Sequence, residues 1–567
     1  MNKIGITKTY IFFIFLFATC AITTFRSSEL TRADEVKEQS SPSFVDKKVT
    51  VYVGYEPYYS CLKNVDDEAV IKYKSSNKKI AKIDADGIVT AVAAGQVTIT
   101  ATVSTGKENG ICTMTVTVKD PYYILDEFPE GVLVGTDTIY SIKRYGYEEP
   151  ATFRLKGSQY ASLEAIDGQS CVLHAKAPGY ITIEVESLGK VKKLKVRIYD
   201  GKGTLFIVYP DSEPYSGRYK ERREYNKYTA GYFLLRSYLE RLETVGGGVL
   251  VLKKGYYDVI ATLCVPSDTT ILFEDGAVIR KIDNTKTKAM TATGSLFQCV
   301  ASTHTTKPFK GYGGEHDINF IGEGQSGIDM GGIASNGITL CHNKNVTITG
   351  LFFKNLNGLH FIELDASNNV NVSYNCFTGY TATSSGHKEA INIDTPDRNT
   401  GGFSQGWTSY DKTPNKNIYI TDNVFKDLEV AVGTHRYSQT EPENEEETPE
   451  MKYHTGINVL RNSFFNITTY GVRLMNWKNC VVMDNSFEET AKFLEKAVVI
   501  SEDGKVTMPK SIGIYVNGAV KPIITGNYFS GFDTVISACP WKNSLIKSRP
   551  NITGGSNYDV TYNEFTD

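Results

Sequence analysis

Short runs of alternating apolar and polar residues fill the chain from about residue 45 to residue 199. Residues 49–53 and 97–101 place Val, Ile or Ala at every second position, and this alternation is typical of a strand with one buried face. The turn-forming run Asp84-Ala85-Asp86-Gly87 lies between such runs. The pattern predicts two small β-sandwiches, one at residues 45–119 and a weaker copy at residues 121–199.

The pattern changes after residue 203. Tyr232, Leu235 and Leu239 recur at helical spacing, which predicts an amphipathic helix over residues 228–242. Three consecutive glycines, 246–248, end this helix, and the apolar run 249–252 begins a strand.

An Asn-x-Phe pair recurs through the rest of the chain. The pairs are Asn375/Phe377, Asn423/Phe425, Asn462/Phe464, Asn485/Phe487, Asn527/Phe529 and Asn563/Phe565. The shortest interval, from Asn462 to Asn485, is 23 residues, about one coil of a parallel β-helix. Longer intervals indicate loops inserted between strands on one face. We expect the Asn side chains to form a structural ladder of stacked amides, and the Phe side chains to stack in the core.

These segments carry two family resemblances. Residues 73–77, 80–83, 87–91 and 94–99 closely resemble the bacterial Ig-like domain of group 2. The resemblance implies spacer or surface-binding modules. The helix, the glycine run and the following strand resemble the opening of pectin-lyase-like right-handed β-helices, in which the helix caps the first coil. The expected fold is all-β: two N-terminal Ig-like β-sandwiches, then a right-handed parallel β-helix over residues 203–567 with an N-terminal capping helix.

Composition and charge narrow the functional classes. The chain has 61 basic and 64 acidic side chains, a net charge of −3, which argues against nucleic acid as a partner. Residues 1–33 resemble an export signal, with Lys3 and Lys8 before an apolar run at residues 10–22. No later apolar run is long enough to span a membrane. We therefore expect a secreted or cell-surface protein without a membrane span.

The cysteines show neither Cys-x-x-Cys nor any Cys/His spacing typical of a metal site, so we expect no metal and no cofactor. Cys61 and Cys112 lie in one predicted domain and could pair.

Candidate chemistry gathers on one outer face of the predicted β-helix. Aligning successive strands by their inward apolar residues, such as Ile391 and Ile393, directs the alternate residues outward. This stacks a set of polar side chains on neighbouring coils: Glu363, Asp365, Asn392, Asp394, His435, Arg473 and Tyr515. Glu389, on the same strand as Asn392, supplies a further neighbouring carboxylate. A general acid needs a carboxyl group whose pKa is raised by burial or neighbouring carboxylates, and this set supplies such groups. Arg473 would hold a substrate oxygen, and Trp407, in a long loop, would stack on a sugar ring.

The order of these residues resembles the polygalacturonase-type glycoside hydrolases. Asn392-Ile393-Asp394 resembles their Asn-x-Asp motif, Gly433-Thr434-His435 their Gly-His-Gly motif, Arg473-Leu474-Met475 their Arg-x-Lys motif, and Tyr515 their final Tyr. Two features depart from the family. No Asp-Asp pair lies between Asp394 and His435, so Asp365 and Asp394 would share that work or the resemblance is only architectural. Met475 stands in place of the Lys that grips a uronate carboxylate, which leaves neutral sugars open.

The sequence therefore predicts an exported glycoside hydrolase that cleaves a polysaccharide in a groove on the β-helix. In this interpretation Asp394 is the general acid, Asp365 or Glu389 is its partner carboxylate, and His435 orients or tunes the acid. Asn392, Glu363, Arg473, Tyr515 and Trp407 bind substrate. Two alternatives stay open: a polysaccharide lyase on the same fold, and a non-catalytic adhesin that binds glycan. The partners expected are a polysaccharide and, through the Ig-like domains, the cell surface.

Overall fold

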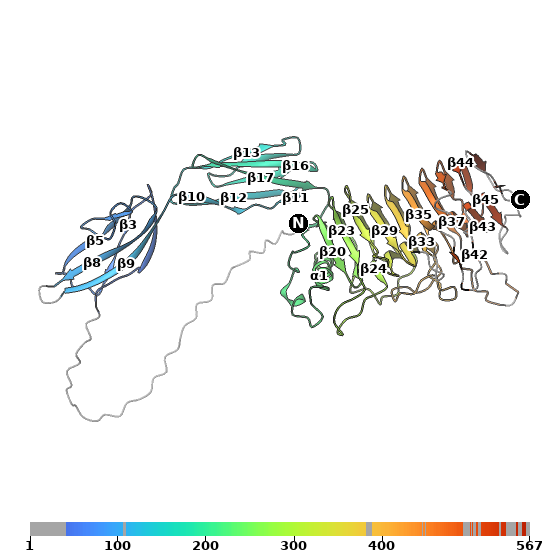
Figure 1. The fold of residues 1–567 in the computed structure, drawn as a ribbon, viewed down its shortest axis with the longest axis horizontal. Helices are drawn as coiled ribbons and strands as arrows, with labels where there is room; N and C mark the ends of the chain where they lie inside the picture. The colour runs from blue at the N-terminus through green and yellow to red at the C-terminus, as the bar shows by residue number, and fades with distance from the viewer. Residues whose placement is uncertain are drawn as a thin grey trace, which may run out of the picture. The chain divides into compact units, whose positions relative to one another are not determined.

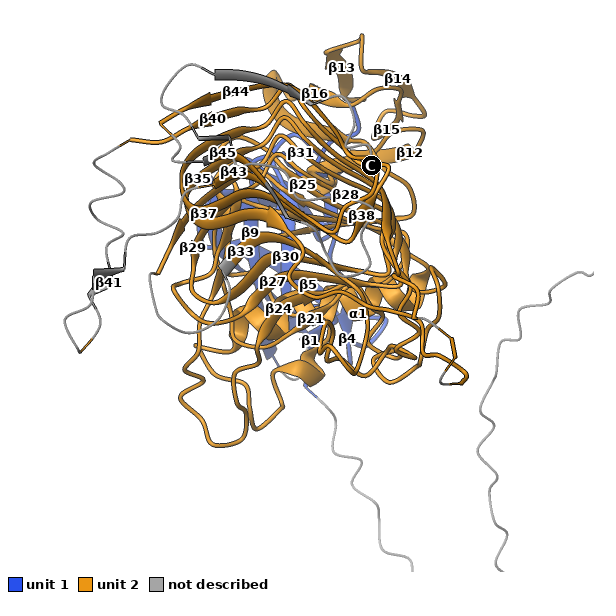
Figure 2. Ribbon diagram, turned by 90° about the vertical axis from the view of Figure 1, so that its right-hand side faces the viewer, with its two compact units in different colours: residues 1–124, 143–149 blue, residues 125–142, 150–567 orange. Residues whose placement is uncertain are grey.

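The computed structural model describes residues 41–105, 109–381, 388–444, 446–447, 449–490, 499–500, 502, 506–507, 512–531, 534–539, 552–553 and 558–562. The expected export signal, residues 1–33, lies outside the described residues. The chain divides into two compact units: residues 1–124 with 143–149, and residues 125–142 with 150–567 (Figure 2). Each unit is built almost entirely from strands (Figure 1).

The first Ig-like domain consists of short sheets that enclose one apolar core. Its strands are β1 (Ser43–Phe44), β2 (Lys48–Tyr52), β3 (Tyr58–Tyr59), β4 (Leu62–Lys63), β5 (Val70–Ser75), β6 (Ala81–Ile83), β7 (Ile88–Ala91), β8 (Gly95–Ser104) and β9 (Asn109–Lys119). A four-stranded sheet, β2-β9-β8-β5, and a three-stranded sheet, β3-β7-β6, bury Ile99, Met114 and Val116. Cys61 and Cys112 are both free, so the disulfide considered from the sequence is not formed.

The second sandwich has two four-stranded sheets, β10-β12-β15-β14 and β11-β17-β16-β13. Its strands are β10 (Tyr122–Glu127), β11 (Gly131–Leu133), β12 (Asp137–Tyr145), β13 (Thr152–Lys156), β14 (Ala161–Ala165), β15 (Ser170–Ala175), β16 (Gly179–Ser187) and β17 (Lys190–Tyr199). The second predicted domain is therefore a β-sandwich, and its membership of the Ig-like family stays a prediction. Leu133 and Tyr199 pack in one cluster with Val249 and Val251 of the next domain, so the second sandwich and the β-helix share an apolar core.

One helix covers the start of the β-helix. A 3-10 turn, η1 (Gly217–Tyr219), precedes α1 (Ala230–Val245). Leu235, Leu239 and Leu242 of α1 are buried against residues of the first coil, among them Leu250 and Val259. α1 ends at Gly246, whose φ of 81° is left-handed, a conformation that glycine adopts without steric cost. This confirms the capping helix expected from the sequence.

The parallel β-helix has three strands in each coil, because each strand pairs in parallel with the strand of the same face one coil later. The first face contains β18 (Thr204–Val208), β19 (Gly248–Leu252), β22 (Thr269–Phe273), β25 (His316–Gly322), β28 (Lys344–Thr349), β31 (Asn368–Ser373), β34 (Lys416–Thr421), β36 (His454–Leu460), β39 (Val481–Met483) and β44 (Ile523–Ser530). The second face contains β20 (Gly255–Val259), β23 (Ala277–Lys281), β26 (Gly327–Asp329), β29 (Phe352–Leu356), β32 (Cys376–Tyr380), β35 (Val424–Gly433), β37 (Ser463–Met475) and β40 (Ser486–Glu488), and it also ends on β44.

The third face is called the site sheet below. It contains β21 (Leu263–Cys264), β24 (Ser295–Gln298), β27 (Asn336–Cys341), β30 (Leu359–Asp365), β33 (Lys388–Asp394), the C-terminal parts of β35 and β37, β43 (Ile512–Asn517) and β45 (Thr534–Cys539). The remaining strands are β38 (Trp477–Lys478), β41 (Val499–Ile500), β42 (Val506–Thr507), β46 (Ile552–Thr553) and β47 (Tyr558–Tyr562). Among the described residues, no helix is long and apolar enough to cross a membrane.

The Asn-x-Phe repeat forms the two columns that the sequence predicts. Asn375 Nδ2 donates to Asn423 Oδ1 at 3.1 Å, and Asn423 donates to Asn462 at 3.0 Å. The ladder continues through Asn485 to Asn527. Phe rings of successive coils stack with centroids 4.5–4.9 Å apart, as in the pair Phe377 and Phe425. The sixth pair, Asn563/Phe565, lies outside the described residues.

Candidate active site

The pairing register of the site sheet stacks the predicted residues on neighbouring coils. Glu363 pairs with Asn392, and Asp365 pairs with Asp394. Asn392 pairs in turn with Gly433, which pairs with Arg473. Paired positions of adjacent strands lie about 4.8 Å apart. Ile391 and Ile393, on which the alignment rests, lie in the core cluster, so the alternate positions Asn392 and Asp394 share one outer face.

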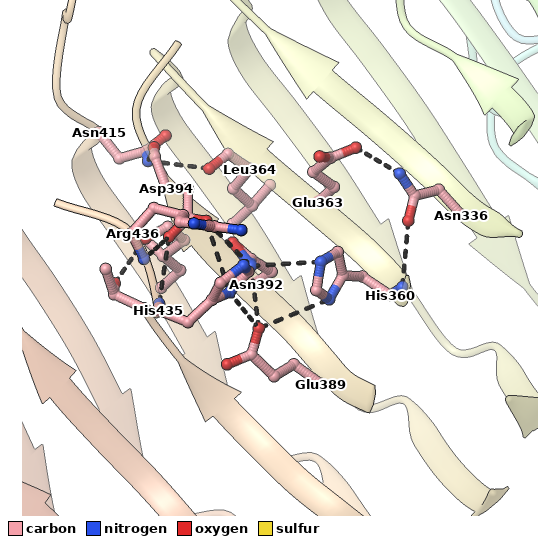
Figure 3. Close-up of polar contacts among 12 residues, drawn as sticks. Asn336, His360, Glu363, Leu364, Glu389, Asn392, Asp394, Asn415, His435 and Arg436 are labelled. Atoms are coloured by element: carbon pink, nitrogen blue, oxygen red, sulfur yellow. Dashed lines mark hydrogen bonds and ion pairs between the residues drawn. The ribbon is translucent and has the colours of Figure 1, made fainter. Parts of the chain in front are cut away.

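Asn392 lies at the centre of this face and is 1% exposed. Its Nδ2 atom lies 2.9 Å from Glu389 Oε2 and 2.8 Å from His435 Nδ1. The same nitrogen lies 3.3 Å from both His360 Nε2 and Asp394 Oδ2 (Figure 3). An amide nitrogen carries two hydrogens, so these four neighbours compete for one group. Asn392 therefore links three successive coils and holds the acidic and imidazole groups at hydrogen-bonding distance.

His435 bridges two carboxyl groups. Its Nδ1 atom lies 2.8 Å from Glu389 Oε2 and 3.5 Å from Asp394 Oδ2. Burial alone would raise the pKa of Glu389, but the hydrogen bond and charge of His435 lower this pKa to about 2. Burial would lower the pKa of His435, and the charges of Asp394 and Glu389 outweigh it and raise this pKa above its usual value. Glu389 is therefore ionised at neutral pH, and its charge favours the protonated form of His435.

Asp394 has the opposite character to Glu389. It is 1% exposed, and burial raises its pKa to about 7, helped by the charge of Glu389. The backbone N–H groups of His435 and Arg436 donate to Asp394 Oδ1, at 3.3 Å and 3.1 Å. These two bonds orient the carboxyl group without ionising it. Glu389 and Asp394, on the same strand as Asn392, are thus held in different protonation states near neutral pH.

Glu363 and Asp365 lie one coil earlier. Asn336 Nδ2 donates to Glu363 Oε2 at 2.5 Å, while Asn336 Oδ1 accepts from the backbone N–H of His360 at 3.1 Å. Burial and the charge of Asp394 raise the pKa of Glu363. Burial and the charge of Glu363 raise the pKa of Asp365. Within the part of the chain that the structure describes, neither oxygen of Asp365 has a hydrogen-bond partner, which favours the neutral acid.

The local sequence creates the space and the anchor that this cluster needs. A Cβ atom at Gly433 would lie 3.0 Å from Arg473 Cβ and 3.6 Å from Glu389 Oε1, so glycine lets the neighbouring coil approach Glu389 closely. Asn415 Nδ2 donates to the backbone oxygens of Leu364 and Asp394, at 3.0 Å and 2.8 Å. It therefore fixes the strand ends that carry Asp365 and Asp394.

The predicted substrate-binding residues divide into two groups. Arg473 is half-buried, with its guanidinium 5.5 Å from the Tyr470 ring, and that ring stacks on Tyr515 at 5.0 Å. These three side chains lie on the coils beyond His435 and form an aromatic and cationic extension of the cluster. The prediction for Trp407 is wrong: this side chain is 2% exposed and packs edge-on against Phe403. Its ring fills a core between loops and offers no face to a sugar.

Sequence reasoning missed His360 and Asn336. His360 pairs with Glu389 in the strand register, and each residue precedes an inward isoleucine, Ile362 or Ile391, by two positions. Both positions therefore have the inward parity of their strands, and the alternation that selects Asn392 and Asp394 does not select His360. Asn336 carries no such signal, because its part in the cluster depends on the side-chain bond to Glu363.

Three residues of the cluster have the geometry of metal ligands. Ligand atoms of His360, Glu389 and His435 all lie within 4.8 Å of one another, and two imidazoles with a carboxylate suit a transition metal. The space between them is taken by Asn392 Nδ2. The expectation of no metal stays a prediction.

A cavity of about 390 Å³ lies next to His435. It is formed by the loop that follows β33 and the loop that follows β35, and its lining includes Asp397, Lys412, Arg436, Tyr437 and Glu441. Lys412 Nζ donates to Glu441 Oε1 at 2.9 Å, so these two charges are paired. The volume of the cavity lies in the range of about 300–1,000 Å³ typical of small-molecule sites.

Among known protein families, one family model matches a segment of this chain. Residues 42–119 match the bacterial Ig-like domain (group 2). No curated protein matches the chain. Among solved structures the chain is similar to the surface adhesin PfbA of Streptococcus pneumoniae, at 18% identity over 57% of this chain and 78% of that chain, with a TM-score of 0.39. It is also similar to domains 4 and 5 of the S-layer protein SbsC, at 15% identity over 28% of this chain and 96% of that chain, with a TM-score of 0.21. Similarity at this level carries no information about function.

Proposed function

We propose that this protein is a glycoside hydrolase that cleaves a polysaccharide on the outer face of the site sheet. One observation carries the proposal: His435 Nδ1 lies 2.8 Å from a Glu389 oxygen and 3.5 Å from an Asp394 oxygen, in surroundings that separate the two carboxyl pKa values. A protonated acid beside an ionised carboxylate is the pair that glycosidic hydrolysis uses.

In the proposed reaction Asp394 donates its proton to the glycosidic oxygen as the bond from that oxygen to the anomeric carbon breaks. A water oxygen forms the new bond to the anomeric carbon, and its proton passes to the ionised Glu389. The negative charge of Glu389 also stabilises the positive charge that develops on the sugar ring. His435 is the positioning residue that keeps Glu389 ionised and holds it close to Asp394.

Substrate would be held by the half-exposed members of the face. Glu363 and Arg473 offer hydrogen bonds to sugar hydroxyls, and Tyr515 offers an aromatic ring on the next coil. Met475 is 4% exposed, so the position that would hold a Lys cation is a buried thioether. This supports neutral sugars over uronates. The proposed location is outside the cell or on its surface, because residues 1–33 have the charge and apolar pattern of an export signal.

The test is a product screen with the full chain on xylan, mannan, galactan and polygalacturonate. Both new reducing ends and the ultraviolet absorbance of unsaturated ends would be measured. The proposal predicts reducing ends without that absorbance, and turnover that falls as the pH rises through about 7, where Asp394 loses its proton. Reducing ends together with the absorbance would instead identify a lyase.

A pair of variants separates catalysis from binding. Asp394→Asn should abolish turnover and keep glycan affinity, because the amide retains the shape of the acid without its proton. The matched control is Asp329→Asn, a buried aspartate of β26 that accepts from Gly331 N and Asn355. This control should keep its activity. If wild type and Asp394→Asn both bind glycan and the wild type shows no turnover, the protein is an adhesin.

A further inference from the structure

The outer face of the site sheet is closed at one end. Every residue of β24 and of β27 is buried, on the outward as well as the inward side. In the later strands the outward positions open: Arg473, Tyr515 and Asn517 are each half-exposed while their inward neighbours stay buried. The next strand, β33, is also buried over residues 389–394, which include Glu389 and Asp394. The accessible part of the face therefore lies on the C-terminal side of these carboxyl groups, from Arg473 onward.

An apolar cluster between loops fills the closed end. Cys341 of β27 pairs with Asp365, which pairs with Asp394, so Cys341 continues the column of these two carboxyl groups by one coil. It is 1% exposed and packs with Val300, Phe309 and Trp407. The position next to Asp365 on this side is thus occupied by side chains of the protein, and a sugar chain cannot pass over it.

Backbone hydrogen bonds join the two loops that carry this cluster. The loop after β24 and the loop after β33 exchange bonds between Phe309 N and Trp407 O and between Ser409 N and Phe309 O, each at 3.0 Å. Gly311 N also donates to Asp411 Oδ2 at 2.7 Å. These bonds hold the apolar cluster and its two loops, together called the barrier below, in one conformation.

A third loop, after β35, extends the barrier. Lys412 Nζ donates to Gln439 O at 3.1 Å, and Ser438 Oγ donates to Asp397 Oδ2 at 2.7 Å. The cavity beside His435 lies between these two loops. It offers room for a chain end next to the carboxyl cluster.

We propose that the protein acts on glycan chain ends and releases one short product, rather than cutting inside the polymer. The proposal rests on the hydrolase function. Its reason is steric: internal cleavage needs a groove open on both sides of the catalytic carboxyl groups, and this face is open on one side. The terminal sugar would enter the cavity beside His435, and the rest of the chain would lie over Arg473 and Tyr515.

The experiment uses the full chain on soluble xylan, mannan, galactan and polygalacturonate, with viscosity, reducing ends and product size followed together. Chain-end action predicts that reducing ends rise while viscosity hardly changes, with one product size from the first time point. An early ladder of products with a steep fall in viscosity would overturn the inference and leave the hydrolase function intact. No reducing ends from any of the four glycans would overturn both.

A variant tests the barrier itself. Trp407→Ala removes the largest side chain of the cluster and should raise the loss of viscosity per reducing end severalfold, because the closed end opens. Trp407→Phe keeps an aromatic ring there and should retain the single product size. If Trp407→Ala folds and remains active with an unchanged product size, the barrier does not set the mode of cleavage.

Discussion

Replacing Asp394 by Asn should stabilise the protein at alkaline pH while it abolishes turnover. Asp394 is buried, and its folded-state pKa is raised from 3.8 to about 7. A group whose folded pKa is raised contributes stability that is present below the unfolded pKa and is lost as the pH rises through the folded pKa. At about 1.4 kcal/mol per pH unit, the interval between the two values corresponds to roughly 4 kcal/mol at pH 8. Asparagine cannot ionise and escapes this loss.

The variant also has a cost that does not depend on pH. An amide nitrogen at the place of Asp394 Oδ2 would face Asn392 Nδ2, now 3.3 Å away, and two donors in contact cost about 1–3 kcal/mol. The observable is therefore the difference in the free energy of unfolding between wild type and variant, measured as a function of pH. Urea unfolding at pH 5 and at pH 8 should show the variant gaining about 2–3 kcal/mol relative to wild type, because about two pH units of this loss lie between pH 5 and the folded pKa. If the free energies of unfolding of wild type and variant differ by the same amount at both pH values, the pKa of Asp394 is not raised.

Three further outcomes follow from the same contacts. His435→Gln removes the charge that holds the Glu389 pKa at about 2, so the acidic limb of the pH–rate profile should move to higher pH, and an unchanged limb would argue against the ion pair. Asn423→Ala removes the side-chain partner of Asn375 N and of Val372 O and should lower the free energy of unfolding by about 1–3 kcal/mol, whereas Asn371→Ala, at a half-exposed position of β31, should change it little in the same urea titration. Dialysis against a chelator should leave turnover unchanged, because Asn392 fills the space between His360, Glu389 and His435; activity lost and restored by a metal would contradict this.

The repeat explains why so much of the β-helix could be predicted from the sequence. Each coil has the same inward apolar pair and the same turn asparagine. Asn462 and Phe464 therefore contact the equivalent residues of the next coil, Asn485 and Phe487. The register then places Asp365 beside Asp394 without any knowledge of side-chain contacts. Local alternation was enough to find these carboxyl groups.

Loops obey no such repeat, and the errors lie there. A tryptophan in a polar loop is expected at the surface, where Trp407 would stack on a sugar, but bonds to a second loop about 100 residues earlier place it in a core. The long-range pairing of Phe309 with Trp407 leaves no local pattern in either segment. Likewise, the protonation states of Glu389 and Asp394 depend on His435, which comes from another coil.

The central claim is that the Asp394 proton drives addition of water across a glycosidic bond. The most direct measurement is mass spectrometry of both fragments from one oligosaccharide of a cleaved glycan, for wild type and Asp394→Asn side by side. Wild type should give fragment masses that add up to the substrate plus one water, and the variant should leave the substrate intact. Fragments that add up to the substrate alone, or unchanged cleavage by the variant, would contradict it.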